Sequence, residues 1–130
     1  MFKKLAATGK IIRITELDVR HTYEPTANPS AEQLMKQADV YRWIIESYKE
    51  NVPATQQSGF TIWSLSDHAD EHTGWFTGDT PNLFDASYAR KPAYKGVCDG
   101  IAGRDISEDF TGDDWKAAYE VKEEETPADQ

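Results

Sequence analysis

The sequence predicts an α/β protein in which two parallel strands are covered by helices. Two segments, residues 11–19 ("IIRITELDV") and 59–65 ("GFTIWSL"), are short, apolar and rich in β-branched or aromatic side chains, which is typical of strands. Each is followed by a loop and then by a segment with apolar residues at helical spacing. Strands that alternate with covering helices imply a parallel sheet with right-handed crossovers.

The chain opens with a predicted helical segment and the first strand. Residues 2–8 are interpreted as the last turns of a helix that Gly9 closes, since glycine readily takes the left-handed conformation at a helix end. Side chains alternate between the two faces of the strand that follows. One face of this strand is therefore predicted to carry Ile12, Ile14, Glu16 and Asp18.

A long helix is predicted after the first strand. Ser30, with Gln33 three residues later, forms a capping box that marks a helix start. Apolar residues then recur on one face until the turn at 52–53, and these are Leu34, Ala38, Tyr41, Ile45 and Tyr48. The aromatic residues of this helix, Trp43 among them, are interpreted as packing residues.

The second strand leads through a long loop into the last predicted helix. Pro92 suits the first helical turn, and Gly103 suits the position after the last one. The packing face of this helix is predicted to consist of Tyr94, Val97, Cys98 and Ile101.

Charge divides the chain into a globular portion, residues 1–103, and an acidic tail, residues 104–130. The tail has ten acidic and three basic residues and supplies most of the formal net charge of −9. We expect the tail to be partly disordered, as highly charged termini usually are.

Composition excludes several classes of function. A pI near 4.7 argues against binding to nucleic acid or to an anionic membrane, because phosphate groups attract clusters of Lys and Arg, and a neutral or cationic ligand is favoured. No apolar stretch approaches the roughly 20 residues of a membrane span. The single Cys98 excludes an internal disulfide and a zinc site built on a cysteine pair.

The loop "WSLSDHADEHTGW", residues 63–75, has two competing interpretations. His68, Glu71 and His72 fit the H-x-x-E-H pattern of inverted zinc peptidases. That chemistry requires both histidines on a rigid helix, whereas this stretch leaves a strand and runs into Thr73-Gly74, so zinc is the less favoured alternative. Tryptophans beside carboxylates instead favour the rim of a carbohydrate site without a bound metal.

Both groups of polar residues follow strands. In a parallel array, ligands bind at the carboxyl ends of the strands, so Glu16-Leu17-Asp18 and the 63–75 loop are predicted to meet on one face. Trp63 could also be an ordinary core residue, because a tryptophan in a strand usually is one. Its position beside the loop favours contact with a sugar.

These residues carry a specific resemblance. "ITELDVR" resembles the strand that bears the catalytic nucleophile in family 10 glycoside hydrolases, the endo-1,4-β-xylanases. "GFTIWSLSDHADEHTGW" and "NLFDASYARKPAYKGV" resemble the last strand, loop and helix of the same enzymes. The resemblance implies that residues 1–103 are the C-terminal portion of a TIM (β/α)8 barrel, its last two βα units.

The same resemblance implies the roles of the site residues. Glu16 would be the nucleophile, and Trp63 and Trp75 would line the subsite of the sugar that is cleaved. Asp18 and Asp67 are predicted to bind substrate as well, although carboxylates at such positions often only orient neighbours or cap turns.

The implied activity is retaining hydrolysis of xylan without a cofactor or metal. Retaining glycosidases need two carboxyl groups about 5 to 5.5 Å apart, and the Asn-Glu pair that carries the acid/base in the family does not precede "ITELDVR" here. The chain is therefore expected to be inactive alone. A noncatalytic xylan-binding module is the alternative function.

The expected partners follow from these inferences. They are xylan or xylo-oligosaccharides, together with the missing N-terminal part of the barrel or a second copy of the chain, because two strands leave open sheet edges that recruit other chains. A secreted or extracytoplasmic location is expected for the parent enzyme, with its signal outside this chain.

Overall fold

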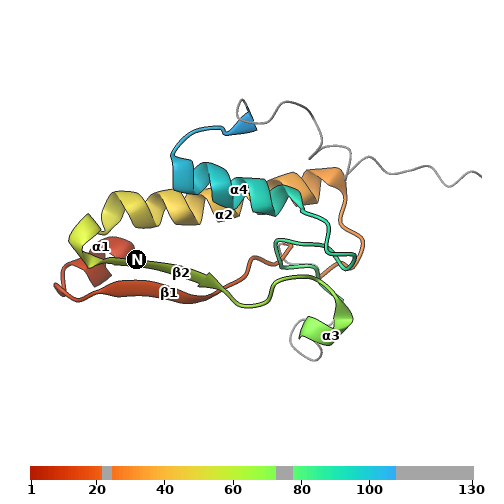
Figure 1. Ribbon diagram of the computed structural model, residues 1–130, viewed down its shortest axis with the longest axis horizontal. Coiled ribbons are helices and arrows are strands. Elements are labelled where there is room, and N and C mark those ends of the chain that lie inside the picture. Colours follow the sequence, from red (N-terminus) through yellow and green to blue (C-terminus); the bar gives the residue numbers. More distant parts are fainter. Residues whose placement is uncertain (22–24, 73–77, 108–130) are drawn as a thin grey trace, which may run out of the picture.

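The structure is a computed structural model that describes residues 1–21, 25–72 and 78–107. Its elements are α1 (Phe2–Ala6), β1 (Ile12–Leu17), α2 (Ala31–Asn51), the 3-10 helix η1 (Ala54–Gln56), β2 (Gln57–Ile62), α3 (Ala69–His72) and α4 (Pro92–Ala102). The strands β1 and β2 pair in parallel, and α2 and α4 lie together over one face of the sheet (Figure 1). The predicted α/β class with a parallel strand pair is therefore confirmed.

The predicted elements differ from the observed ones mainly at their ends. Both strands are six residues long, and β2 ends at Ile62, so that Trp63 belongs to the following loop. The capping box of α2 is confirmed, since the Ser30 hydroxyl accepts a hydrogen bond from the Gln33 amide and the Gln33 side chain accepts one from the Ser30 amide. Gly9 takes the predicted left-handed conformation, with φ of 70°.

The pairing of the strands contains two irregularities that compensate each other. Ile12 pairs with Gln57, Ile14 with Phe60 and Leu17 with Ile62. Between the first two pairs β2 has one extra residue, and between the last two pairs β1 has one extra residue. Such bulges break the strict alternation of side chains.

The bulge in β1 corrects the prediction for Glu16. Ile12, Ile14 and Leu17 all pack against the helices, whereas Glu16 is exposed. Strict alternation predicts that Glu16 shares a face with Ile12 and Ile14. In the structure it does not share that face. The extra residue at Thr15–Glu16 turns the carboxylate towards the uncovered face of the sheet.

Tyr48 of α2 stabilises the bulge in β2. Its buried hydroxyl donates a hydrogen bond to the Ile12 carbonyl (2.7 Å) and accepts hydrogen bonds from the amides of Ser58 (3.0 Å) and Gly59 (3.1 Å). Gly59 has φ of 86°, which a residue with a side chain rarely adopts. One side chain thus satisfies backbone groups that the irregular pairing leaves without a partner.

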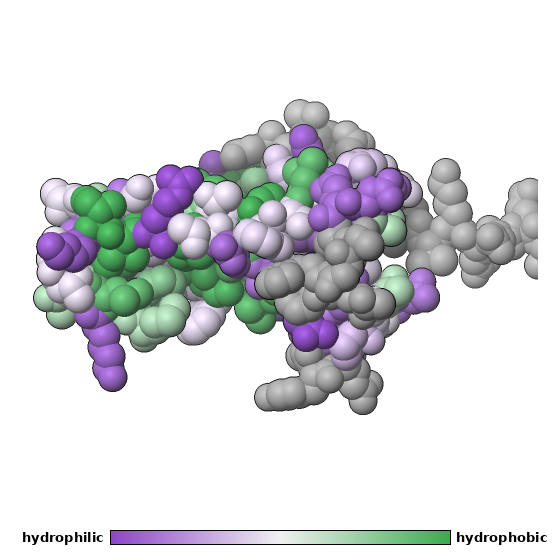
Figure 2. Space-filling model, turned by 90° about the horizontal axis from the view of Figure 1, so that it is seen from below, coloured by the Kyte–Doolittle hydropathy of each residue, from purple (hydrophilic) through white to green (hydrophobic). Residues whose placement is uncertain are grey.

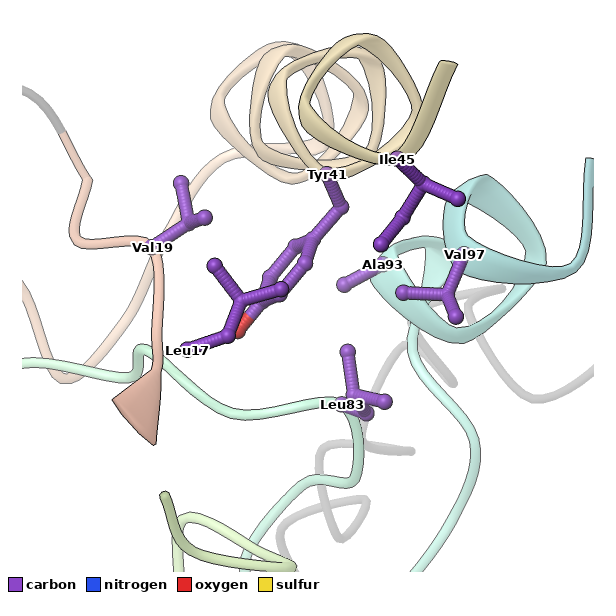
Figure 3. Close-up of a cluster of buried hydrophobic side chains, with 7 residues drawn as sticks. All are labelled: Leu17, Val19, Tyr41, Ile45, Leu83, Ala93 and Val97. Carbon is purple, nitrogen blue, oxygen red and sulfur yellow. The ribbon is translucent and has the colours of Figure 1, made fainter. Parts of the chain in front are cut away.

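The core lies between the sheet and the two long helices. Seven buried side chains from β1, α2, α4 and the connecting loops converge there (Figure 3): Leu17, Val19, Tyr41, Ile45, Leu83, Ala93 and Val97. Tyr41 extends from α2 into the centre of this cluster, and its hydroxyl donates to the Pro81 carbonyl (2.7 Å). The predicted packing face of α2 is confirmed for Ala38, Tyr41, Ile45 and Tyr48, which are all buried.

The packing face of α4 differs from the prediction. Glycines at a spacing of four face α2: a Cβ on Gly96 would lie 2.2 Å from the Ala38 carbonyl oxygen, and one on Gly100 would lie 2.9 Å from the Ile45 Cβ. Of the predicted packing residues, Val97 is buried in the core cluster and Tyr94 packs against it, whereas Cys98 is only partly buried and Ile101 is exposed. The two helices approach so closely because these positions carry no side chain.

No helix in the described part of the chain covers the opposite face of the sheet (Figure 1). Arg13 spans the two strands there, donating to the Thr61 hydroxyl (2.8 Å). Seen from that side in Figure 2, hydrophobic residues reach the surface over the part of the molecule that holds the strands and α1. On the outer side of α2, Trp43 is 66% exposed, so its interpretation as a packing residue is wrong for the described part of the chain.

The acidic tail is described only as far as Ser107. Asp105 forms an ion pair with Lys95 of α4 (2.8 Å), which also pairs with Asp99 (2.6 Å). The prediction of a partly disordered tail concerns residues that otherwise lie outside the described ranges. Within those ranges, no helix is long and apolar enough to cross a membrane.

Candidate functional site

Glu16 and Trp63 lie at the same edge of the sheet. Glu16 is exposed near the carboxyl end of β1, and Trp63, 44% exposed, is the first residue after β2. The Trp63 amide donates to the Leu17 carbonyl (3.1 Å), which joins the two strand ends directly. The sequence predicted that residues 16–18 and the 63–75 loop meet at one edge of the sheet. The structure shows this for Glu16 and Trp63.

Asp18 follows Leu17 and is half-buried. Burial, and in second place the Asp18 charge, raise the pKa of the Tyr41 hydroxyl, which keeps Tyr41 protonated and able to donate to Pro81. Asp18 is the first residue after the strand that carries Glu16. Its carboxylate lies close enough to α2 for its charge to raise the pKa of Tyr41.

Asp67 is buried in an ion pair with Lys91. The side chains are 2% and 3% exposed, and the Lys91 ammonium donates to Asp67 (2.7 Å) and to the carbonyls of Thr80 (2.6 Å) and Asn82 (2.8 Å). The other Asp67 oxygen accepts from the Asn82 amide (2.9 Å). Burial lowers the pKa of Lys91, and the Asp67 carboxylate acts in the opposite direction.

This burial changes the interpretation of Asp67. A carboxylate enclosed by Lys91 and Asn82 does not present its oxygens to a sugar, so the predicted direct contact with substrate does not fit this geometry. Asp67 instead fixes the loop that follows β2, because its bonds join residue 67 to residues 82 and 91. It belongs to the alternative class of carboxylates that orient neighbours.

A second buried carboxylate joins the two loops at the site edge. Asp79 pairs with Arg20 (2.9 Å) and accepts from the Thr80 amide (2.9 Å), and its side chain is fully buried. Gln37 of α2 donates to the carbonyls of Val19 (2.7 Å) and Thr80 (2.9 Å). The loop after β1 and the loop after β2 are therefore held in one arrangement.

His21 is buried within this arrangement without hydrogen-bond partners among the described residues. It is 2% exposed, and neither ring nitrogen is bonded. Burial lowers the pKa of His21, and the nearby Lys91 charge lowers it further, although Asp79 and Asp67 act in the opposite direction. The neutral ring is thus favoured in the folded state.

The histidine loop does not form the helix that the zinc alternative requires. α3 begins at Ala69, after His68, and has four residues. Glu71 accepts a hydrogen bond from the Ser66 amide (2.9 Å), and this bond lowers the pKa of Glu71. Within the described ranges, no group of three or more His, Cys, Asp or Glu side chains could hold a metal ion. Trp75 and the side chain of His72 lie outside the described residues.

Comparison with known proteins decides the family. The model of glycosyl hydrolase family 10 matches residues 1–100. The chain belongs to glycosyl hydrolase family 10. The resemblance of "ITELDVR" and of the 59–75 segment to this family is confirmed.

Curated family 10 relatives match most of this chain but only a small part of their own length. Endo-1,4-beta-xylanase A from Cellvibrio japonicus is 33% identical over 106 residues, which are 72% of this chain and 17% of that protein. Endo-beta-1,4-xylanase Xyn10C from the same organism is 31% identical over 121 residues, 78% of this chain and 19% of that protein. The chain thus spans about a fifth of the length of these two relatives.

Solved family 10 structures have the same fold over the matched region. A thermostable mutant of the C. japonicus xylanase Xyn10A superposes with a TM-score of 0.68 at 31% identity, covering 78% of this chain and 34% of that one. A mutant of Xyn10C in complex with xylopentaose superposes with a TM-score of 0.68 at 26% identity, covering 78% of this chain and 23% of that one. The matched region is thus 34% of one structure and 23% of the other.

Sequence reasoning missed the buried polar residues that hold the loops of the candidate site together. Lys91, Asp79 and Asn82 were assigned no role, and all three are buried polar residues. The sequence signal that could have found two of them is the position of Asn82 directly before Leu83 and of Lys91 directly before the predicted helix start at Pro92. The ion pairs Lys91–Asp67 and Arg20–Asp79 join residues that are far apart in the sequence, so residue spacing does not predict them.

Proposed function

We propose that this chain is the nucleophile half of a retaining endo-1,4-β-xylanase, the last two βα units of a family 10 TIM barrel. In this arrangement β1 and β2 are the seventh and eighth barrel strands, and their uncovered face looks into the barrel. Membership of the family, and relatives named as xylanases, support the proposal. The observation that carries it is the exposed Glu16 carboxylate at the same carboxyl edge of the sheet as Trp63, whose amide is bonded to the neighbouring Leu17 carbonyl.

The proposed reaction follows the two-step course of retaining glycosidases. A Glu16 oxygen attacks the anomeric carbon while an upstream carboxylic acid protonates the leaving glycosidic oxygen. The glycosidic bond breaks, and a glycosyl ester forms on Glu16. Water, deprotonated by the same upstream group, then attacks the anomeric carbon and releases Glu16.

The other site residues have supporting roles in this proposal. Trp63 and Trp75 pack against the apolar face of the sugar, and Asp18 contacts substrate from the edge of the site. Asp67 acts through the loop, since its carboxylate is bonded to Lys91 and Asn82. We expect a secreted or extracytoplasmic parent enzyme, because its polymeric substrate lies outside cells.

The test uses this chain combined with an upstream barrel portion that supplies the acid/base. Glu16→Ala should reduce xylan hydrolysis by about a thousandfold or more, because the covalent step loses its nucleophile. Added azide should restore cleavage in this variant by attacking the anomeric carbon in place of the carboxylate. Glu50→Gln, at an exposed carboxylate of α2, is the matched control and should keep full activity.

If Glu16→Ala still hydrolyses xylan at nearly the original rate, Glu16 is not the nucleophile. If the combined protein retains xylan but releases no xylo-oligosaccharides, the alternative of a noncatalytic binding module is favoured. Chromatography of the products separates these outcomes.

A further inference from the structure

An exposed aromatic pair lies on the loop that follows Trp63. The rings of His68 and Tyr88 are stacked, with centroids 5.6 Å apart and an interplanar angle of 19°. Tyr88 is nevertheless 51% exposed, so His68 supports the ring while much of it stays accessible. Neither residue contributes to the core clusters or to the Asp67–Lys91 pair.

The backbone holds Tyr88 in an unusual conformation. Its φ of 64° is the only positive value at a non-glycine position in the described residues. A bulky residue rarely adopts this conformation, and such outliers concentrate at functional sites. The turn that imposes it is closed by Asp85, which accepts hydrogen bonds from the amides of Tyr88 (3.0 Å), Ser87 (2.8 Å) and Ala89 (2.9 Å).

Polar contacts fix the ring further. The Glu71 carboxylate beside the Tyr88 hydroxyl raises the pKa of Tyr88. Glu71 is itself bonded to the Ser66 amide, and His68 accepts a hydrogen bond from the Asp70 amide (3.2 Å). The pair is thus a rigid, exposed aromatic surface with hydrogen-bonding groups at its border.

This surface lies within reach of a ligand that extends from the candidate site. His68 is five residues after Trp63, so their backbones are at most roughly 17 Å apart. The bridge between Ser66 and Phe84 and the bond from the Asp67 amide to the Phe84 carbonyl (3.0 Å) hold the Tyr88 turn beside this loop. A flat, extended, uncharged polymer is the kind of ligand that could touch both Trp63 and Tyr88.

We propose that the Tyr88 ring, supported by His68, is a further sugar-binding platform that takes a xylose unit of the substrate chain beyond the unit held at Glu16 and Trp63. The proposal rests on the proposed function, because that function supplies the polymer. The platform binds by packing against the apolar face of the sugar, and the border groups bond to its hydroxyls.

Affinity for oligosaccharides of two lengths tests this platform. The full chain is titrated calorimetrically with xylohexaose, which can reach Tyr88, and with xylobiose, which occupies the Trp63 region alone. Tyr88→Asn removes the ring and keeps a residue that tolerates positive φ. It should weaken xylohexaose binding about three- to tenfold and leave xylobiose binding unchanged.

Three further variants sharpen the result. Tyr88→Phe keeps the ring and should bind xylohexaose like the unaltered chain. His68→Ala removes the support of the ring and should weaken xylohexaose binding in the same sense as Tyr88→Asn. Trp43→Ala, at an exposed aromatic residue on the outer side of α2, is the matched control and should have no effect.

Unchanged xylohexaose affinity in Tyr88→Asn would overturn the platform, and so would equal losses for both oligosaccharides, which indicate a collapsed loop. A chain that binds neither oligosaccharide also overturns the platform. The proposed function still stands in each case if Glu16-dependent hydrolysis appears once the upstream barrel portion is added.

Discussion

His21 is a buried histidine among charged side chains. Lys91, Asp79 and Asp67 all act on it, and neither ring nitrogen has a hydrogen-bond partner in the described part of the chain. Burial and Lys91 together outweigh the two carboxylates, so the pKa of His21 lies below its ordinary value of 6.5. The unfolded chain therefore binds a proton at a higher pH than the folded chain does.

This difference predicts the direction of a pH effect on stability. The free energy of unfolding should fall as the pH drops below about 6.5 and stop falling, for this group, below the folded-state pKa. His21→Leu should remove this part of the pH dependence. Urea unfolding at about pH 7.5 and about pH 5 measures it in both proteins.

His68→Leu is the control for the effect of His21. His68 is only partly buried, and its replacement should leave the difference between the two pH values as large as in the unaltered chain. If His21→Leu loses as much free energy of unfolding between the two pH values as the unaltered chain does, His21 is not the source of this pH dependence.

Individual residues also mark where sequence reasoning stops. The exposed position of Glu16 could not be derived from alternation, because one extra residue in β1 reverses the side on which it lies. Asp67 looked like a substrate ligand because it follows a strand, and only the distant Lys91 makes it an internal partner. Both outcomes depend on contacts that residue spacing does not encode.

Elements with local signals were predicted well. The start of α2 follows from its capping box and its buried face from apolar periodicity, and both depend on residues within a few positions of each other. The packing of α4 was predicted less well, because its closest contact with α2 is made by glycines and not by its larger apolar residues. Gly96 and Gly100 were overlooked, although their spacing of four is a signal for close helix packing.

Gly96 is the sharpest test of the α2–α4 contact. A Cβ there would lie 2.2 Å from the Ala38 carbonyl oxygen and 2.9 Å from its carbon, and the backbone of α2 cannot yield as a flexible side chain would. Gly96→Ala should therefore lower the free energy of unfolding by about 1–3 kcal/mol, although alanine favours helices over glycine. Thermal or urea unfolding measures the change.

Ala102→Ser, at an exposed position of the same helix, is the control for Gly96→Ala. Its effect should stay within about 0.5 kcal/mol. A Gly96→Ala protein that is more stable than the unaltered chain would mean that the two helices are further apart than described.

The molecule as a whole leaves apolar surface uncovered. Among the described residues, the sheet has two strands and no helix covers one of its faces, and Trp43 and Val40 on α2 are exposed. Open strand edges and apolar surface recruit other chains. We expect the isolated chain to self-associate, or to gain stability when an upstream barrel portion is added, and to be inactive alone.

Light scattering after size-exclusion chromatography tests this expectation over a range of protein concentrations. The mass should exceed that of a monomer and rise with concentration, and Trp43→Lys should lower it if α2 takes part. A stable monomer at all concentrations that hydrolyses xylan by itself would contradict the expectation that the chain needs an upstream barrel portion for its fold and for its acid/base.

The paired irregularities of β1 and β2 have a consequence for comparing such strands. The two irregularities act like frameshifts of opposite sign in the pairing of the strands. The β2 residue that pairs with Ile12 lies 45 positions later in the sequence, the partner of Ile14 lies 46 positions later, and the partner of Leu17 again lies 45 positions later. Deleting one extra residue alone would shift one strand end against the other, whereas deleting both would keep the ends level and leave one residue, instead of Thr15 and Glu16, between Ile14 and Leu17 on the side away from the helices. A compensated pair of insertions can therefore add a side chain to the uncovered face of such a sheet while the two strand ends stay level.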